Sequence, residues 1–199
     1  MKNRLLALIL ISEFALQFAV AEAAQTKTLK LTEKNIDKIV AAMTLEEKAN
    51  IVVGMSRSLT DAETANIGYT KKIVPGAAGT TYPIPRLGVT PMVFADGPAG
   101  VRISTTRKGV DRKFYCTGFP VGTLLSSTWN DALVETVGNA LGEEAKEYGV
   151  DVLLAPGLNI MRNPLCGRNF EYYSEDPLLT GKIAAAYVRG VQSEGVGTS

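Results

Sequence analysis

The amino-acid sequence predicts a parallel α/β fold, because apolar segments of strand length alternate with segments of helical pattern. Short apolar runs occur at 92–95, 119–127 and 150–155, and each has the composition of a buried strand. Apolar residues recur at helical spacing in 130–148 and 177–191, after the second and the third run. A helix between two strands returns the chain to the starting edge of the sheet, so strands joined in this way run parallel.

The composition is that of a folded globular chain without a marked charge preference. Of 199 residues, 46% are hydrophobic and 21% charged, and 21 Lys and Arg balance 20 Asp and Glu. Without a basic excess, nucleic acid is not an expected partner. The sequence has no His and 2 Cys, which excludes His-dependent nucleophilic catalysis and a four-ligand zinc site. No metal or cofactor is expected, so chemistry must use carboxylates, Arg, Lys, Tyr or hydroxyl groups.

Residues 1–23 have the pattern of a secretory signal peptide. Lys2 and Arg4 precede the apolar stretch Leu5–Ile11, and Ala21-Glu22-Ala23 has the small-x-small form of a cleavage site. Glu13 interrupts the apolar residues, and a membrane span needs about 20 of them, so no transmembrane span is expected. We therefore expect export to the periplasm or the outside of the cell. The alternative is an amphipathic first helix.

Two helices are predicted before the first strand. Residues 24–43 form a leader and a helix whose apolar face includes Ile36 and Ile39, with Thr32 as the expected N-cap. The main region, 44–199, opens with a second helix, because Thr44–Glu47 has the form of a capping box and Gly54 suits the position after the last turn. Residues 54–91 hold many Gly, Pro and Thr and are expected to form a long excursion.

The strands and helices of the main region follow in order. Met92–Ala95 is the first strand and Phe119–Ser127 the second, followed by a helix over 130–148 in which Gly138 and Gly142 are expected to mark close packing. Val150–Ala155 is the third strand, followed by a helix over 177–191. The last residues, 195–199, hold at most the start of a fourth strand. No nucleotide-binding glycine motif follows any of these strands.

Cys116 and Cys166 lie fifty residues apart, and their spacing leaves two possibilities open. Export would permit a disulfide between them. Two unpaired thiols are at least as compatible with the sequence, because two cysteines are far from a disulfide scaffold.

Polar residues follow two of the predicted strands, where ligands collect in parallel α/β folds. The first group is Asp96–Arg102, in which a carboxylate comes directly after an apolar strand and Gly97 and Gly100 permit close backbone approach. Such an Asp can accept hydrogen bonds from two sugar hydroxyls. An Asx-turn explains the same residues equally well.

The second group follows the third strand and is dense in amides, Arg and aromatic residues, as carbohydrate sites are. It comprises Asn159, Arg162, Asn163, Cys166, Gly167, Arg168, Asn169, Phe170, Glu171, Tyr172, Tyr173, Ser174, Glu175 and Asp176. Structural roles compete for several of these. Ser174 or Asp176 suits the N-cap of the next helix, Tyr172 and Tyr173 suit packing, and Arg168 could pair with Glu171.

Three segments make the sequence resemble glycoside hydrolase family 3, in particular its bacterial β-glucosidases: FADGPAGVRI, GFPVGTLLSSTWN and APGLNIMRNPLCGRNFEYYSEDP. The resemblance runs from about Thr44 to Ser199. It implies a (β/α)₈ TIM-type barrel followed by further domains. Such a barrel takes roughly 250 residues, so 44–199 would be the N-terminal portion of the barrel domain, with about the first three βα units.

The resemblance also implies roles for individual residues. Asp96, Arg102 and Arg168 would hold the terminal glucosyl unit of an oligosaccharide or β-glucoside substrate. Retaining glycosidases use a carboxylate nucleophile and an acid/base carboxylic acid roughly 5 to 5.5 Å apart. In the family both come from segments that would lie beyond Ser199, so neither role is assigned to a residue here, and the 199-residue chain by itself is expected to be inactive.

Retaining hydrolysis of terminal β-D-glucosyl residues is therefore the expected function of the complete protein. One alternative is a non-catalytic sugar-binding or inactive fragment. Another is a β-xylosidase or N-acetylglucosaminidase specificity within the same family.

Overall fold

The computed structural model describes residues 29–56 and 73–199, so the predicted signal peptide, 1–23, lies outside the described residues. The chain divides into two compact units. One comprises Met1–Lys48 and Pro83–Thr90, and the other Ala49–Tyr82 and Pro91–Ser199.

In the first unit, α2 (Ile36–Ala42) buries Ile39, and a 3₁₀ turn, η1 (Pro85–Leu87), buries Leu87. The predicted N-cap at Thr32 is wrong. The helix begins after Asn35, whose Oδ1 accepts from the Thr32 N–H at 2.8 Å and whose Nδ2 donates to the Lys30 carbonyl at 2.8 Å. The Asn35 side chain thus closes the turn before the helix, and Thr32 is held by that turn.

The second predicted helix is α3 (Leu45–Val53), and its capping box is confirmed. The Thr44 N–H donates to Glu47 Oε2 at 2.8 Å, and the Glu47 N–H donates to Thr44 Oγ1 at 3.1 Å. Arg86 also pairs with the Glu47 carboxylate, with Nε donating to Oε1 at 2.7 Å. Gly54 ends the helix at φ +69°, as its position predicts.

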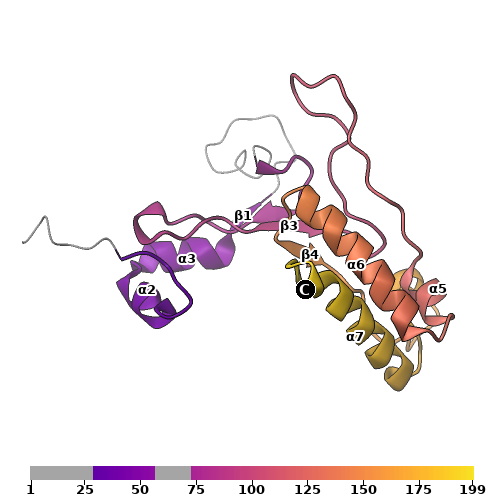
Figure 1. The fold of residues 1–199 in the computed structure, drawn as a ribbon. Helices are drawn as coiled ribbons and strands as arrows, with labels where there is room; N and C mark the ends of the chain where they lie inside the picture. The colour runs from indigo at the N-terminus through magenta and orange to yellow at the C-terminus, as the bar shows by residue number, and fades with distance from the viewer. Residues whose placement is uncertain (1–28, 57–72) are drawn as a thin grey trace, which may run out of the picture. The chain divides into compact units, whose positions relative to one another are not determined.

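The α/β fold class is confirmed, but the sheet is mixed rather than wholly parallel (Figure 1). Its order is β1 (Met55–Ser56), β2 (Gly79–Thr80), β3 (Val93–Asp96), β4 (Val152–Leu154) and β5 (Gly197–Thr198). β1, β2 and β3 pair antiparallel, whereas β3, β4 and β5 pair parallel. The antiparallel strands come from the excursion at 54–91, where two-residue strands leave no apolar pattern.

The strand predicted at 119–127 is wrong. Gly122–Ser126 forms a short helix, α5. The hydroxyl groups of two of its residues hold it against the segment that precedes the helix at 177–193. Thr123 Oγ1 donates to the Tyr172 carbonyl at 2.8 Å, and Ser126 Oγ donates to the Tyr173 carbonyl. Periodicity alone cannot distinguish a short buried helix from a strand in such an apolar run.

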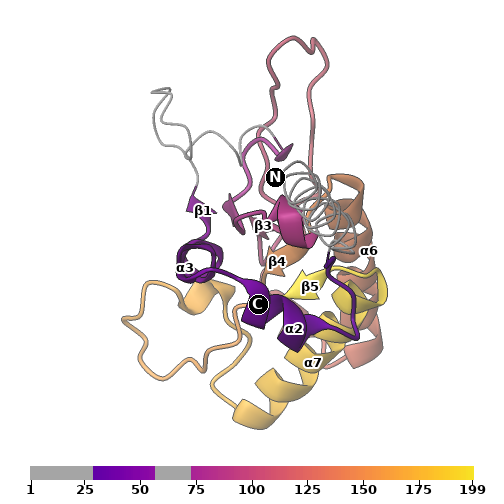
Figure 2. The same cartoon turned by 90° about the vertical axis from the view of Figure 1, so that its left-hand side faces the viewer.

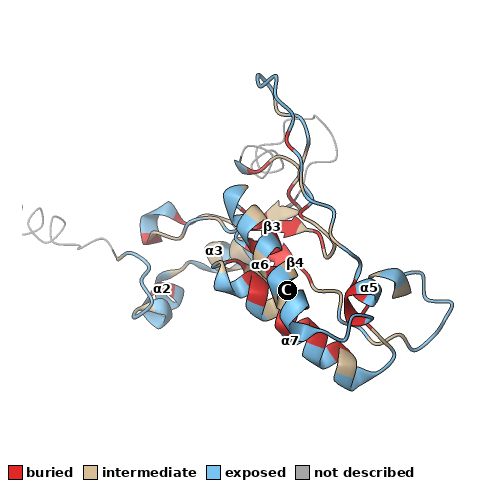
Figure 3. Ribbon diagram, turned by 45° about the vertical axis from the view of Figure 1, so that its right-hand side comes forward, coloured by how far each residue is buried: buried red, intermediate tan, exposed pale blue. Residues whose placement is uncertain are grey.

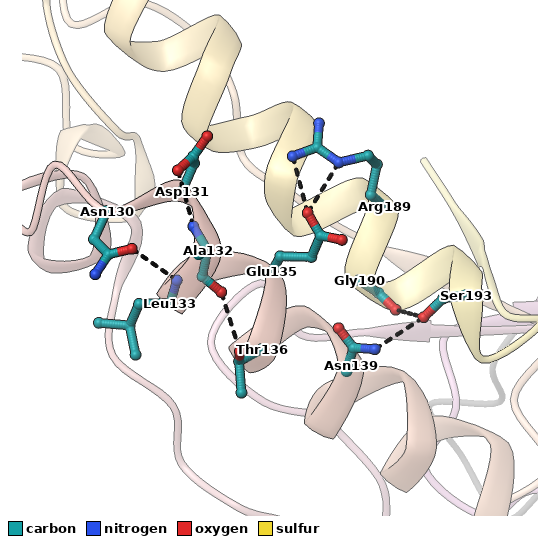
Figure 4. A network of polar contacts seen from close by, with 10 residues as sticks. All are labelled: Asn130, Asp131, Ala132, Leu133, Glu135, Thr136, Asn139, Arg189, Gly190 and Ser193. Carbon is teal, nitrogen blue, oxygen red and sulfur yellow. Dashed lines mark hydrogen bonds and ion pairs between the residues drawn. The ribbon is translucent and has the colours of Figure 1, made fainter.

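The two long helices, α6 (Asp131–Glu147) and α7 (Pro177–Ser193), pack side by side on the same side of the sheet (Figures 1 and 2). Asn130 caps α6 by accepting from the Leu133 N–H at 3.0 Å, and Asp176 caps α7 by accepting from the Leu178 N–H at 2.8 Å. Polar contacts run along their seam, including Arg189 Nη2 to Glu135 Oε2 at 2.9 Å (Figure 4).

The core lies between these helices and the strands. Val93, Ala95 and Leu153 are buried on the strands, and Leu141 and Tyr187 are buried on the helices against them. Figure 3 shows buried stretches along β3, β4, α6 and α7. Among the described residues, no helix is both long and apolar enough to cross a membrane.

Candidate functional site

A cavity of about 390 Å³ lies at the carboxyl end of β3. It brings together all three residues that the sequence singles out as sugar ligands, namely Asp96, Arg102 and Arg168. The remaining lining residues come from the turn after β3, the start of α5 and the 3₁₀ turn η2 (Asn169–Glu171). They are Gly97, Pro98, Ala99, Gly100, Val121, Gly122, Phe170 and Glu171.

Asp96 is the last residue of β3, and its side chain pairs with Arg102 across the turn that follows. Asp96 Oδ2 accepts from Arg102 Nη1 at 2.9 Å, and the Arg102 backbone N–H donates to the Asp96 carbonyl at 2.8 Å. The carboxylate bonds to this side chain, and no Asx-turn forms in this part of the described structure. The side chains of Asp96 and Arg102 are 45% and 72% exposed, so their ion pair adds little stability and both remain accessible to a ligand.

Two glycines make this turn possible, although the close approach is to backbone of the same chain. Gly97 has φ +142° and Gly100 has φ +134°. A Cβ at Gly97 would lie 1.9 Å from the Gly100 carbonyl oxygen, and one at Gly100 would lie 2.3 Å from the Thr117 carbonyl oxygen. Any larger residue would displace the turn that carries Asp96 and Arg102.

Arg168 reaches the same cavity from the segment after β4. Its Nε donates to Glu171 Oε1, which confirms the pairing that the sequence leaves open. This hydrogen bond, the Glu171 charge and the more distant charge of Asp96 raise the pKa of Arg168 above its usual value. The Glu171 side chain is only 12% exposed, whereas that of Arg168 is 71% exposed. Glu171 therefore anchors one edge of the guanidinium group and leaves its other nitrogens for a ligand.

Phe170 is a lining residue to which sequence reasoning assigns no separate role, whereas Glu171 is expected only as a possible partner of Arg168. Phe170 is 63% exposed, so its ring offers an apolar surface beside the charged groups. The signal was present, because a large apolar residue stands between polar residues that follow a strand. The sequence does not reveal that Phe170 and Arg168 reach one cavity, because the irregular turn η2 sets the direction of each side chain.

The rest of the polar segment after β4 serves other purposes. Tyr172 and Tyr173 are buried, and Asp176 caps α7, as their structural interpretations predict. A second cavity, of about 650 Å³, is lined by other members of the segment, including Asn159, Arg162 and Asn169. The segment is thus divided between two cavities.

Both cysteines are free thiols in the structure. Cys116 is partly buried and Cys166 is exposed. Within 29–56 and 73–199, no three His, Cys, Asp or Glu side chains are grouped so as to hold a metal ion.

The chemistry of the 390 Å³ cavity is that of polar recognition. Two guanidinium groups donate hydrogen bonds and two carboxylates accept them, which matches the alternating donors and acceptors of a polyol. Each carboxylate is paired with an arginine. This arrangement of paired donors and acceptors suits binding rather than proton transfer.

Much of this chain is similar to known proteins in sequence and in structure. The model of the glycosyl hydrolase family 3 N-terminal domain matches residues 98–199. Thermostable beta-glucosidase B of Acetivibrio thermocellus is 41% identical over 166 residues, which are 82% of this chain and 19% of that protein. An exo-alpha-(1->6)-L-arabinopyranosidase of Bifidobacterium longum is 40% identical over 164 residues, 80% of this chain and 19% of that protein.

Among solved structures, beta-glucosidase 3B of Thermotoga neapolitana in complex with alpha-D-glucose superimposes with a TM-score of 0.74 at 53% identity. The match covers 82% of this chain and 22% of that one. The chain therefore spans about one fifth of the length of the relatives it matches.

Proposed function

The chain belongs to glycosyl hydrolase family 3, and we propose that its residues form the sugar-holding part of the active site of a retaining β-glucosidase. The observation that carries the proposal is the single cavity lined by Asp96, Arg102 and Arg168. The Asp96 carboxylate would accept hydrogen bonds from two hydroxyls of the terminal glucosyl unit, and the two arginines would donate to its oxygens. The β-glucosidase names among the relatives support this substrate class.

We infer further that β3, β4 and β5 belong to the start of a (β/α)₈ barrel, within a domain portion covering 44–199. Their parallel pairing, with α6 between β3 and β4 and α7 between β4 and β5, supports this. The proposed cavity at the carboxyl end of β3 fits the position of active sites in such barrels.

The proposed division of labour assigns binding to these residues and bond cleavage to carboxylates outside them. Both carboxylates of the cavity are held by arginine, whereas a nucleophile and an acid/base must change their bonding during the reaction. The 199-residue chain alone should therefore bind glucose weakly and hydrolyse nothing.

Glucose titration of the 199-residue chain, followed by amide chemical shifts in NMR spectra, tests the binding role. Asp96→Asn should weaken binding about 10- to 100-fold, the cost of losing hydrogen bonds to a charged group. Glu143→Gln, which removes an exposed carboxylate on α6, is the matched control and should bind as the parent chain does. Equal binding by Asp96→Asn and the parent would refute the assignment.

A hybrid enzyme tests the activity. The matching segment of the Thermotoga neapolitana enzyme would be replaced by residues 44–199, and aryl glycosides would be supplied as substrates. We expect hydrolysis of the β-D-glucoside and its loss with Asp96→Asn. A preference for the β-xyloside, the N-acetyl-β-glucosaminide or the α-L-arabinopyranoside, the last suggested by one relative's name, would replace the glucosidase assignment.

We also propose export of the protein through a signal peptide formed by residues 1–23. The support is the basic start, the apolar core and the Ala21-Glu22-Ala23 tripeptide. Mass spectrometry of the protein from the periplasm or medium of an expressing bacterium should find Ala24 as the first residue. Retention of Met1 in an intracellular product would contradict the proposal.

A further inference from the structure

Trp129 lies in an unusual setting between α5 and α6. It is the one tryptophan of the sequence, and it is 76% exposed. Its φ is +53°, and among the described residues it is the only non-glycine residue with a positive φ. A bulky side chain rarely adopts that conformation. The turn is held by the Trp129 N–H, which donates to the Ser126 carbonyl at 3.1 Å.

The indole ring borders a cavity of about 310 Å³, separate from the two already described. Its apolar lining comes from the first turns of α7, and its polar lining from the beginnings of both long helices. The lining residues other than Trp129 are Asp131, Asp176, Leu178, Leu179, Lys182 and Ile183. This volume is at the lower end of small-molecule sites, which begin at roughly 300 Å³.

The polar groups of this cavity offer both acceptors and a donor. Asp131 Oδ1 accepts from the Ala132 N–H at 3.0 Å, and Asp176 Oδ1 accepts from the Leu178 N–H at 2.8 Å. Figure 4 shows the Asp131 carboxylate at the start of α6. In the described part of the chain, Oδ2 of each carboxylate and the Lys182 ammonium group make no hydrogen bond or ion pair. Two acceptors and one three-proton donor are thus available beside an aromatic face.

We propose that Trp129, Asp131, Asp176 and Lys182 form a second, non-catalytic carbohydrate site. A pyranose ring has an apolar face that stacks on an indole, and hydroxyls around its edge that both donate and accept hydrogen bonds. The Lys182 charge disfavours an organic cation, which would otherwise suit a tryptophan beside two carboxylates. The choice of a β-linked glucose oligosaccharide as ligand rests on the proposed function. The identification of the site itself rests on its aromatic and polar groups and is independent of that function.

The emission of Trp129 is a direct reporter, because no other tryptophan contributes to it. The 199-residue chain would be titrated with cellotetraose, with glycerol as the control for viscosity and hydroxyl content. We expect a saturable blue shift and reduced quenching by acrylamide with cellotetraose, and neither with glycerol. No saturable change with cellotetraose, or the same change with choline instead, would overturn the proposal.

Variants that each remove one charged group test whether cellotetraose binds at this cavity. Lys182→Met and Asp131→Asn should each raise the dissociation constant about tenfold or more. Lys146→Met, at an exposed lysine of α6, is the matched control and should titrate as the parent does. If Lys182→Met and Asp131→Asn both bind cellotetraose as the parent chain does, this site is not the one that binds.

The proposals for the two sugar sites can be refuted independently of each other. Asp96→Asn should weaken glucose binding at the first cavity about 10- to 100-fold and leave the Trp129 titration unchanged. A Trp129 response that persists without glucose binding at Asp96 would refute only the proposed function. Glucose binding at Asp96 without a Trp129 response would refute only the second site.

Discussion

Glu171 anchors the guanidinium group of Arg168, so a largely buried carboxylate determines where an exposed cation lies. Glu171→Gln removes the charge and keeps the size of the side chain. We expect the affinity for glucose to fall about tenfold, because a neutral acceptor holds an arginine less firmly. The measurement is the dissociation constant from the NMR titration, with the melting temperature recorded beside it. An unchanged dissociation constant would show that Arg168 needs no anchor.

The helices α6 and α7 approach so closely that glycine is required at their crossing. A Cβ at Gly138 would lie 2.5 Å from the Tyr187 carbonyl oxygen, and one at Gly190 would lie 2.2 Å from the Glu135 carbonyl oxygen. Each Gly→Ala change there should lower the free energy of unfolding by about 1–3 kcal/mol, as overpacking does. Urea unfolding of each variant measures the loss.

Gly181→Ala is the control for those variants. It lies within α7, and a Cβ there would meet no atom within 4 Å. Alanine should stabilise this helix by up to about 1 kcal/mol, because it restricts the unfolded chain and favours the helix. Destabilisation by Gly181→Ala equal to that of Gly190→Ala would mean that close packing at the crossing does not explain the effect.

The Glu47 carboxyl should make stability depend on acid pH. Its hydrogen bond from Arg86, the backbone hydrogen bond from Thr44 and the Arg86 charge lower its pKa from 4.5 to about 2. Because the folded value lies below the unfolded one, the stabilisation is complete above about pH 4.5 and is lost as the pH falls towards 2. Unfolding of the parent chain and of Glu47→Gln across this range should show a difference that disappears in acid.

Arg86→Met separates the effect of Arg86 on the pKa of Glu47 from the effect of the capping box. It removes the ion pair and leaves the capping box of Thr44 and Glu47 in place. The carboxyl carbon of Glu47, followed by NMR, should then titrate closer to the ordinary value. A midpoint that stays near 2 in Arg86→Met would assign the shift to the helix cap instead.

The two thiols should react at very different rates. Burial, with a smaller contribution from the Glu144 charge, raises the pKa of Cys116 to about 11, whereas Cys166 is exposed. Since the thiolate is the reactive form, iodoacetamide at neutral pH should label Cys166 first. Mass spectrometry of peptides over time gives both rates. Denatured, unreduced protein should contain two titratable thiols, and fewer would indicate the disulfide that the sequence leaves open.

Local interactions explain which elements were predictable. The capping box of Thr44 and Glu47, the cap at Asp176 and the end of α3 at Gly54 each depend on residues within one helical turn, so their pattern is visible in the sequence. The same reasoning failed at 119–127, where contacts of Thr123 and Ser126 with the distant Tyr172 and Tyr173 select a helix. It also missed β1 and β2, since a two-residue strand is specified by its neighbours in the sheet.

In the candidate sites, too, local associations were predictable from the sequence and associations between distant segments were not. Asp96 and Arg102 are neighbours across one turn, so their association follows from the order of residues and two obligatory glycines. That Arg168 joins them depends on the parallel pairing of β3 and β4, which brings distant loops to one edge of the sheet. The cavity at Trp129 needs the beginnings of α6 and α7 side by side, which no local pattern specifies.

The sequence by itself determined the α/β class, the two long helices, and the polar residues from which a sugar site could be built. Hydrophobic periodicity and capping involve residues only a few positions apart, so both can be recognised directly in the sequence. Only the tertiary structure decided that the sheet is mixed, that Arg168 faces the cavity of Asp96, and that Trp129 stands exposed above α7 residues. These arrangements depend on contacts between distant segments, whose free energy arises only when the helices and strands pack together.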